Sequence, residues 1–98
     1  MSQLNNSQIR FLRSRAHSLN PVVMVAGNGL SETVMDAIDE ALEYHELIKV
    51  KLRTEEREEK LTFIEQICKK TRSTKIQTIG HIVVLYRPAK NPKLIFEH

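Results

Sequence analysis

The segment Leu47–Arg53 constrains the fold most strongly, because apolar and basic side chains alternate along it. Ile48, Val50 and Leu52 fall on one face of an extended chain, and Lys49, Lys51 and Arg53 fall on the other. A helix packed over the basic face would bury cations without partners, at severe energetic cost. The segment therefore predicts a strand whose sheet has one apolar face and one open, basic, hydrated face.

Three helices are predicted around this strand. Apolar spacing indicates a first helix over residues 7–17, which ends before Asn20-Pro21. A second helix follows Ser31, a suitable N-cap, and ends near His45. Thr54 is expected to cap a third helix, whose apolar stripe consists of Leu61, Ile64, Ile67 and Cys68.

Three further strands are predicted. Val22–Val25 is an uninterrupted apolar run, as expected of a strand covered on both faces. Ile76–Ile79 and Ile82–Tyr86 flank Gly80-His81, a connection with glycine first, which favours a type II′ hairpin. Arg87-Pro88 ends the last strand, and residues 89–98 are read as a tail.

The resulting order is α-β-α-β-α-β-β. Strand-helix-strand connections of this length give parallel neighbours, and the terminal hairpin adds an antiparallel strand. We therefore expect an α/β fold in which helices pack on a four-stranded mixed sheet. Residues 1–98 are expected to form a single domain.

Charge is segregated along the chain, although the net charge is only +3. Residues 32–46 contain six acidic side chains and no Lys or Arg, whereas residues 1–31 contain three basic side chains and no acid. A polyanion should avoid the acidic helix and settle on the basic remainder. Lys49, Lys51 and Arg53 repel one another unless something binds them, which favours contact with a polyanion.

The loop Ala26-Gly27-Asn28-Gly29 joins the first predicted strand to the second helix. Its glycines leave backbone N–H groups uncovered, and the helix N-terminus that follows offers further donors and a positive dipole end. An anion such as phosphate could bind there. Gly and Asn are also common in strand-to-helix turns that bind no anion, because both residues tolerate positive φ. The spacing alone therefore leaves both an anion site and an ordinary turn open.

No enzyme, metal or cofactor signature is found. The third glycine of the dinucleotide fingerprint is missing, and the chain has no G-x-x-x-x-G-K-[ST] motif. Cys68 falls on an apolar helix side and is read as a structural thiol, and a structural role is also favoured for His45-Glu46. The four histidines lack metal-ligand spacing: His17, His45, His81 and His98. Without a signal peptide or spanning segment, a cytoplasmic monomer that contacts no membrane is expected.

Four runs of residues carry a family resemblance: RSRAHSLNPVV (13–23), GLSE (29–32), ALEYHELIKVK (41–51) and LYRP (85–88). Together they resemble the CRM domain, in its bacterial stand-alone, YhbY-like form, over nearly the whole chain. The HELIKVK run, placed after a glycine loop and its helix, is the most specific of these features. The resemblance implies a fold similar to the C-terminal domain of translation initiation factor three.

The resemblance also implies function. The family binds RNA, and its bacterial members are linked to precursors of the large ribosomal subunit, so we expect a ribosome-assembly protein that binds ribosomal RNA. The family's G-x-x-G loop becomes A-G-N-G here, and Ala26 disfavours the positive φ that glycine allows. Tyr86 is a further candidate for base or ribose contact. The expected RNA-binding residues are Gly27, Asn28, Gly29, Arg10, Arg13, Arg15, Lys49, Lys51, Arg53 and Arg87.

Two alternatives remain open at this point. The first is a protein-interaction adaptor, whose acidic helix 32–43 would bind a basic ribosomal protein. The second is a small nucleotide-dependent enzyme. Co-purification of RNA would favour RNA binding over either.

Overall fold

The structure is a computed structural model, and it describes residues 4–26 and 29–89. Its elements are α1 (Asn6–Ala16), β1 (Pro21–Val25), α2 (Glu32–His45), β2 (Leu47–Leu52), α3 (Arg57–Thr71), β3 (Thr74–Ile79) and β4 (Ile82–Tyr86). The α/β class and the order α-β-α-β-α-β-β are therefore confirmed.

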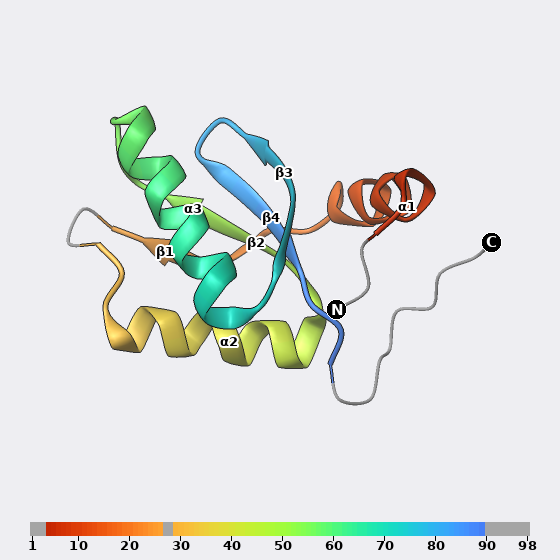
Figure 1. The fold of residues 1–98 in the computed structure, drawn as a ribbon, viewed down its shortest axis with the longest axis horizontal. Coiled ribbons are helices and arrows are strands. Elements are labelled where there is room, and N and C mark those ends of the chain that lie inside the picture. The colour runs from red at the N-terminus through yellow and green to blue at the C-terminus, as the bar shows by residue number, and fades with distance from the viewer. Residues whose placement is uncertain (1–3, 27–28, 90–98) are drawn as a thin grey trace.

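The strands form one mixed sheet in the order β1-β2-β4-β3. β1 runs parallel to β2, starting from the pair Pro21 and Lys49, and β4 is antiparallel to both β2 and β3. Figure 1 shows α2 and α3 lying on one side of this sheet and α1 at the far end from the β1–α2 connection. The mixed sheet is thus the predicted one, with β2 in a central position.

Helices cover the two faces of the sheet unequally. α2 and α3 bury a large core that includes Ile38, Ile67 and the alternate residues Ile48, Val50 and Leu52 of β2. The opposite face has a smaller core, in which Leu12 and Ala16 of α1 pack on one end of the sheet. The predicted open basic face of β2 is therefore confirmed only in part: α1 covers the end at Leu47, Lys49 is half-buried, and the face is open around Lys51 and Arg53.

The prediction that β1 is covered on both faces is wrong. β1 is an edge strand, and Val22 and Met24 are 49% and 50% exposed, whereas Val25 on the opposite face is buried. An uninterrupted apolar run is typical of a buried strand, but here the outer half of the run lies on the open face.

The start of α3 also differs from the prediction. The Thr54 hydroxyl accepts a hydrogen bond from Glu56 N and donates one to Glu59 Oε1, 2.6 Å away, so Thr54 shapes the turn before the helix. The N-cap is Glu56, without a side-chain cap bond, and α3 begins at Arg57. Leu61 is 54% exposed and lies outside the buried stripe predicted for it.

Two local predictions are confirmed. Ser31 caps α2, because its hydroxyl accepts a hydrogen bond from Val34 N at 3.1 Å. In the hairpin, Gly80 has a φ of 57° while His81 is not in the positive region, as a type II′ turn requires.

The junction between α2 and β2 is built around Glu46. This residue is fully buried and has a φ of 67°, which is strained for a side chain of this size. Its Oε2 accepts a hydrogen bond from Ala89 N, and its backbone oxygen accepts one from Arg87 N. Burial, with the nearby Glu46 charge, raises the pKa of Tyr86. Glu46 thus holds the chain that leaves β4, which agrees with its predicted structural role.

Candidate nucleic-acid interface

One row of side chains crosses all four strands on the open sheet face. Met24 pairs with Lys51, Lys51 with Ile82, and Ile82 with Ile79, and residues paired in this way point to the same face. Lys51 is exposed, and Ile79 is 55% exposed. The row therefore presents a cation between apolar side chains to solvent.

Arg53 extends this row toward β1. Its backbone N–H donates to the carbonyl oxygen of Val25 at 2.8 Å, and its guanidinium Nη1 lies 3.9 Å from Met24 Sδ. Within residues 4–26 and 29–89, the ion pairs all involve Arg87, so neither Lys51 nor Arg53 is neutralised by an acid. Both cations are available to an anion.

A hollow of about 410 Å³ opens beside these cations and is called the cationic hollow here; it is lined by Lys51, Leu52, Arg53, Thr54, Glu55 and His81. The backbone N–H of Leu52 donates to the carbonyl oxygen of His81 at 2.7 Å, so the β3–β4 turn is held against the end of β2. His81 was not among the residues predicted from the sequence to bind RNA. Only the pairing of β2 with β4, distant in sequence, brings it to this place.

The glycine loop follows β1 and lies at the same end of the sheet as Arg53. Gly29 N–H donates to the Ala26 carbonyl oxygen at 3.0 Å, which closes a turn, and Gly29 has a φ of 90°. Ala26 does not have positive φ, so alanine is compatible with this loop. Gly27 and Asn28, both predicted to contact phosphate, lie outside the described residues.

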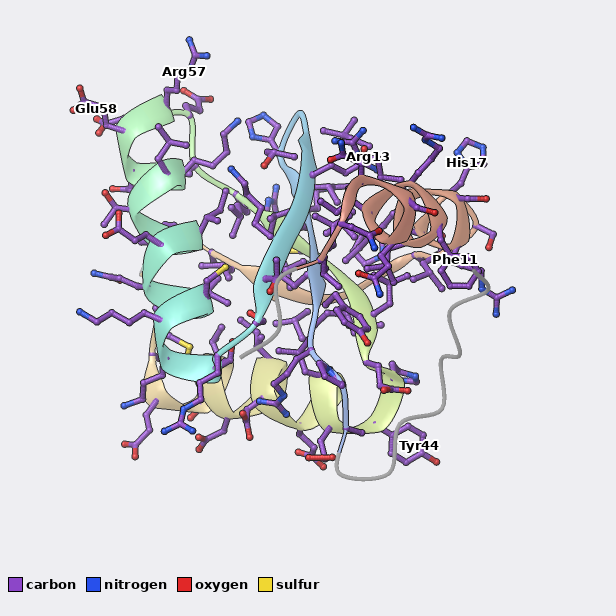
Figure 2. All side chains as sticks on the ribbon, turned by 45° about the vertical axis from the view of Figure 1, so that its right-hand side comes forward. Phe11, Arg13, His17, Tyr44, Arg57 and Glu58 are labelled. Carbon is purple, nitrogen blue, oxygen red and sulfur yellow. The ribbon has the colours of Figure 1, made fainter. Side chains whose placement is uncertain are left out.

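The arginines of α1 form a separate group. Arg10, Arg13 and Arg15 are all exposed, as predicted. Figure 2 shows Arg13 and His17 on α1 at one end of the molecule, whereas Arg57 and Glu58 mark the start of α3 at the other end. The predicted RNA-binding residues therefore do not gather at a single site, and the α1 group is remote from the glycine loop.

Lys49 lies between the two groups. It is half-buried, and its Nζ donates a hydrogen bond to the carbonyl oxygen of Leu19, which follows α1, at 2.9 Å. This bond satisfies a backbone acceptor and ties α1 to β2. Lys49 thus shares the face of Lys51 and Arg53 but is already engaged by the protein.

Arg87 is held by protein groups. Its Nη1 lies 2.6 Å from Asp39 Oδ1 and also donates to the Thr71 carbonyl oxygen at 2.9 Å, while Nη2 donates to the Asp39 carbonyl oxygen at 3.1 Å. The side chain is 17% exposed. These bonds give Arg87 a structural role, and its predicted contact with RNA gains no support from its position.

The acidic surface of α2 faces the protein's own cations at two places. Asp39 and Glu43 lie beside Arg87. Glu32 and Asp36 line a hollow between α2 and α3 that also contains the basic side chains Lys69, Lys70 and Arg72. Part of the acidity that suggested an adaptor is therefore balanced within the fold.

In the described residues, no cluster of three His, Cys, Asp or Glu side chains could hold a metal ion, and no helix has the length and hydropathy needed to cross a membrane. Burial raises the pKa of the Cys68 thiol, against weaker opposing effects of Ser73 and Lys75. A raised pKa disfavours the reactive thiolate.

The fold and the open face define a class: a small α/β domain with two helices on one side of a mixed sheet, and a third helix and exposed cations on the other. The chain belongs to the CRS1/YhbY (CRM) domain family, which matches residues 4–87. The family that the four sequence runs suggested is therefore confirmed.

Relatives agree with this assignment. The chain is 50% identical over 94 residues to a protein named as an RNA-binding protein in Haemophilus influenzae, covering 96% of this chain and 95% of that protein. It is 42% identical to a probable RNA-binding protein of Bacillus subtilis, covering 94% and 96% of the two chains. The solution structure of a Staphylococcus aureus protein matches with a TM-score of 0.80 and 36% identity, over 93% of this chain and 95% of that one.

Proposed function

We propose that this protein binds RNA, mainly through the phosphate backbone, and acts in assembly of the large ribosomal subunit. The observation that carries the proposal is the exposed pair Lys51 and Arg53, which no acid neutralises within the described residues. Cations on a rigid strand can contact successive phosphates without an ordering cost for the backbone.

Three further features support RNA as the ligand. The family and the names of its relatives point to RNA. Arg53 donates its backbone N–H to Val25, the last residue of β1, and Gly29 precedes the N-terminus of α2, where backbone donors favour an anion. The exposed apolar side chains Met24 and Ile79 lie in the same row as Lys51 and offer surface to unstacked bases, which a single-stranded RNA exposes.

The test is the salt dependence of RNA binding. Lys51→Gln combined with Arg53→Gln should reduce the log–log slope of affinity against salt by about 1.4, because each phosphate contact on a single strand contributes roughly 0.7. Lys69→Gln combined with Lys70→Gln removes the same charge from the last turn of α3, on the other side of the sheet, and is the matched control. Fluorescence anisotropy with a labelled oligoribonucleotide measures both.

Two results would count against the proposed interface. Equal slope changes in the two double variants would mean that net charge alone attracts RNA. If the wild-type protein binds no RNA at low salt, the proposed RNA-binding function is wrong, and the adaptor alternative is favoured.

The assembly role rests on the family resemblance and needs a cellular test. We expect the protein to migrate with immature large subunits in sucrose gradients, and to be scarce on mature ribosomes, because later folding hides the RNA that a weakly sequence-specific domain needs. Raising salt should release it from the particles. Protein found only at the top of the gradient, in cells that accumulate precursors, would contradict this role.

A further inference from the structure

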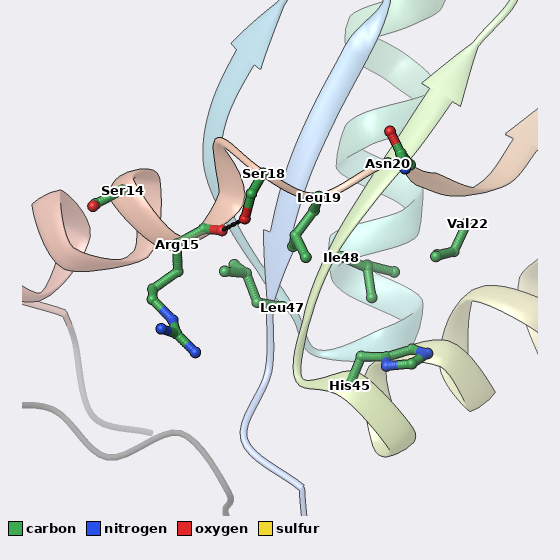
Figure 3. Close-up of a pocket in the computed structure, with 9 residues that line it drawn as sticks. All are labelled: Ser14, Arg15, Ser18, Leu19, Asn20, Val22, His45, Leu47 and Ile48. Atoms are coloured by element: carbon green, nitrogen blue, oxygen red, sulfur yellow. Dashed lines mark hydrogen bonds between the residues drawn. The ribbon is translucent and has the colours of Figure 1, made fainter.

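A groove lies between the end of α1 and the junction of α2 with β2, at the opposite end of β2 from the cationic hollow. Its volume is about 620 Å³, and its lining consists of Ser14, Arg15, Ser18, Leu19, Asn20, Val22, His45, Leu47 and Ile48. Figure 3 shows Arg15 entering from α1 on one side, His45 from α2 on the other, and Leu47 and Ile48 between them.

The groove results from the register of the sheet. β1 first pairs with β2 at Pro21 and Lys49, although β2 already begins at Leu47. Proline has no N–H with which to extend the ladder, so the chain before it turns away toward α1. On the side of β1, the start of β2 is therefore left beside an open space, whereas on its other side Leu47 and Ile48 pair with Tyr86 and Leu85 of β4.

We infer that this groove holds one unstacked nucleotide of a single-stranded RNA, with its base against the exposed side chain of Val22 and its phosphate at Arg15. This inference rests on the proposed RNA binding and adds a second site to it. The volume falls within the range of small-ligand sites, which is about 300–1,000 Å³.

The chemistry of the lining favours a nucleotide. Val22 is 49% exposed and offers apolar surface to the flat face of a base, while Leu47 and Ile48 are buried beneath the groove. The Asn20 amide and the His45 imidazole combine donors and acceptors, as recognition of base edges requires. The Tyr44 ring lies edge-on to His45, with 5.1 Å between ring centroids.

Charge selects an anion. Arg15 is exposed and forms no ion pair within the described residues, and no carboxylate is found among the residues that line the groove. A basic peptide would meet only repulsion here, whereas the hollow between α2 and α3 offers Glu32 and Asp36. The charges of the lining residues therefore favour an anionic ligand in this groove and not a basic peptide.

Position links the groove to the cationic hollow. Lys49 binds the carbonyl oxygen of Leu19 at the groove and shares the open face with Lys51. Leu47 and Lys51 are about 13 Å apart along β2 at the usual rise per residue. The α1–β1 connection at Leu19 lies between the two sites, so one strand of RNA that occupies both passes over that connection.

The test compares RNA in two forms. A labelled oligouridine of about ten nucleotides exposes its bases, whereas a blunt RNA duplex of about the same length keeps them paired. Ser14→Leu places bulk over the groove, and Ser7→Leu makes the same change on α1 outside it. Both improve helix propensity, so neither should lower the melting temperature.

Ser14→Leu should weaken oligouridine binding about tenfold and leave duplex binding unchanged, while Ser7→Leu should change neither. Arg15→Gln should weaken oligouridine binding several-fold more than Arg10→Gln, which removes the same charge from the same helix.

Other outcomes overturn the inference. Unchanged oligouridine affinity in Ser14→Leu, or equal losses for Arg15→Gln and Arg10→Gln, would exclude a nucleotide in the groove while wild-type RNA binding keeps the proposed function intact. A loss in Ser14→Leu that is equal for oligouridine and duplex would mean that the groove holds backbone and not an unstacked base. Wild-type protein that binds neither RNA would remove both proposals.

Discussion

Arg87 Nη1 lies 2.6 Å from Asp39 Oδ1, which joins the residue after β4 to the middle of α2 across 48 positions of sequence. The same guanidinium binds the Thr71 carbonyl oxygen at the end of α3. One side chain therefore ties the sheet to both helices that cover one of its faces, and Arg suits this because its planar donors reach several acceptors at once.

Arg87→Gln should lower the free energy of unfolding by about 2 kcal/mol, since hydrogen bonds to charged groups contribute roughly 1.5–3 kcal/mol. Urea denaturation measures this. Arg10→Gln, on the exposed face of α1, should change stability by less than about 0.5 kcal/mol. A folded Arg87→Gln protein whose RNA affinity falls far more than that of Arg10→Gln would restore Arg87 to the RNA site.

Gly29→Ala should destabilise the protein by about 1–2 kcal/mol, because the φ of 90° disfavours any side chain. Space is not the cause, since the new Cβ would lie 3.9 Å from the Phe63 ring, an ordinary contact. Ala26→Gly should lower the free energy of unfolding by less than about 1 kcal/mol, because glycine only adds conformational freedom to the unfolded chain. Urea denaturation of the two variants checks this, and equal losses would mean that the backbone at Gly29 is not strained.

Cys68 should react with iodoacetamide at a midpoint pH above that of the urea-unfolded chain, because burial raises the pKa of its thiol. Between the pKa of the unfolded chain and the higher pKa of the native protein, the native thiol keeps a proton that the unfolded thiol has lost. The free energy of unfolding therefore falls as the pH rises through this alkaline range. Labelling rates across pH, in native and unfolded protein, measure the difference. A native midpoint at or below the unfolded one would contradict the burial effect.

Local patterns predicted the elements well. The alternation of Leu47–Arg53 predicted β2 and its open face, Ser31 predicted the start of α2, and Gly80-His81 predicted the hairpin turn. Each of these three features is determined by residues close together in the sequence, so periodicity and backbone preferences are enough to predict it.

Features that depend on sheet order could not be read locally. Val22–Val25 resembles a buried strand, and only its edge position in β1-β2-β4-β3 exposes Val22 and Met24. His81 reaches the cationic hollow through the pairing of β4 with β2, and Arg87 finds Asp39 through helix packing. The predicted site residues were split for the same reason, because the packing of α1 sets where its arginines lie.

The two lysines of β2 should separate stability from RNA binding. Lys49→Gln removes the bond to the Leu19 carbonyl oxygen and should lower the free energy of unfolding by roughly 1.5 kcal/mol, since the half-buried acceptor is left without that donor. Lys51→Gln changes an exposed side chain and should leave stability within about 0.5 kcal/mol. It should instead reduce the salt slope of RNA binding by about 0.7.

Urea denaturation and anisotropy titrations on the same two preparations measure both effects. Because the substitutions are identical in chemistry and lie two residues apart on one strand face, net charge and local sequence cannot account for a difference between them. Identical behaviour of the two variants in both assays would mean that the Lys49 contact with Leu19 contributes nothing to holding α1 on the sheet. A Lys51→Gln variant with an unchanged salt slope would show that RNA does not follow the open face of β2.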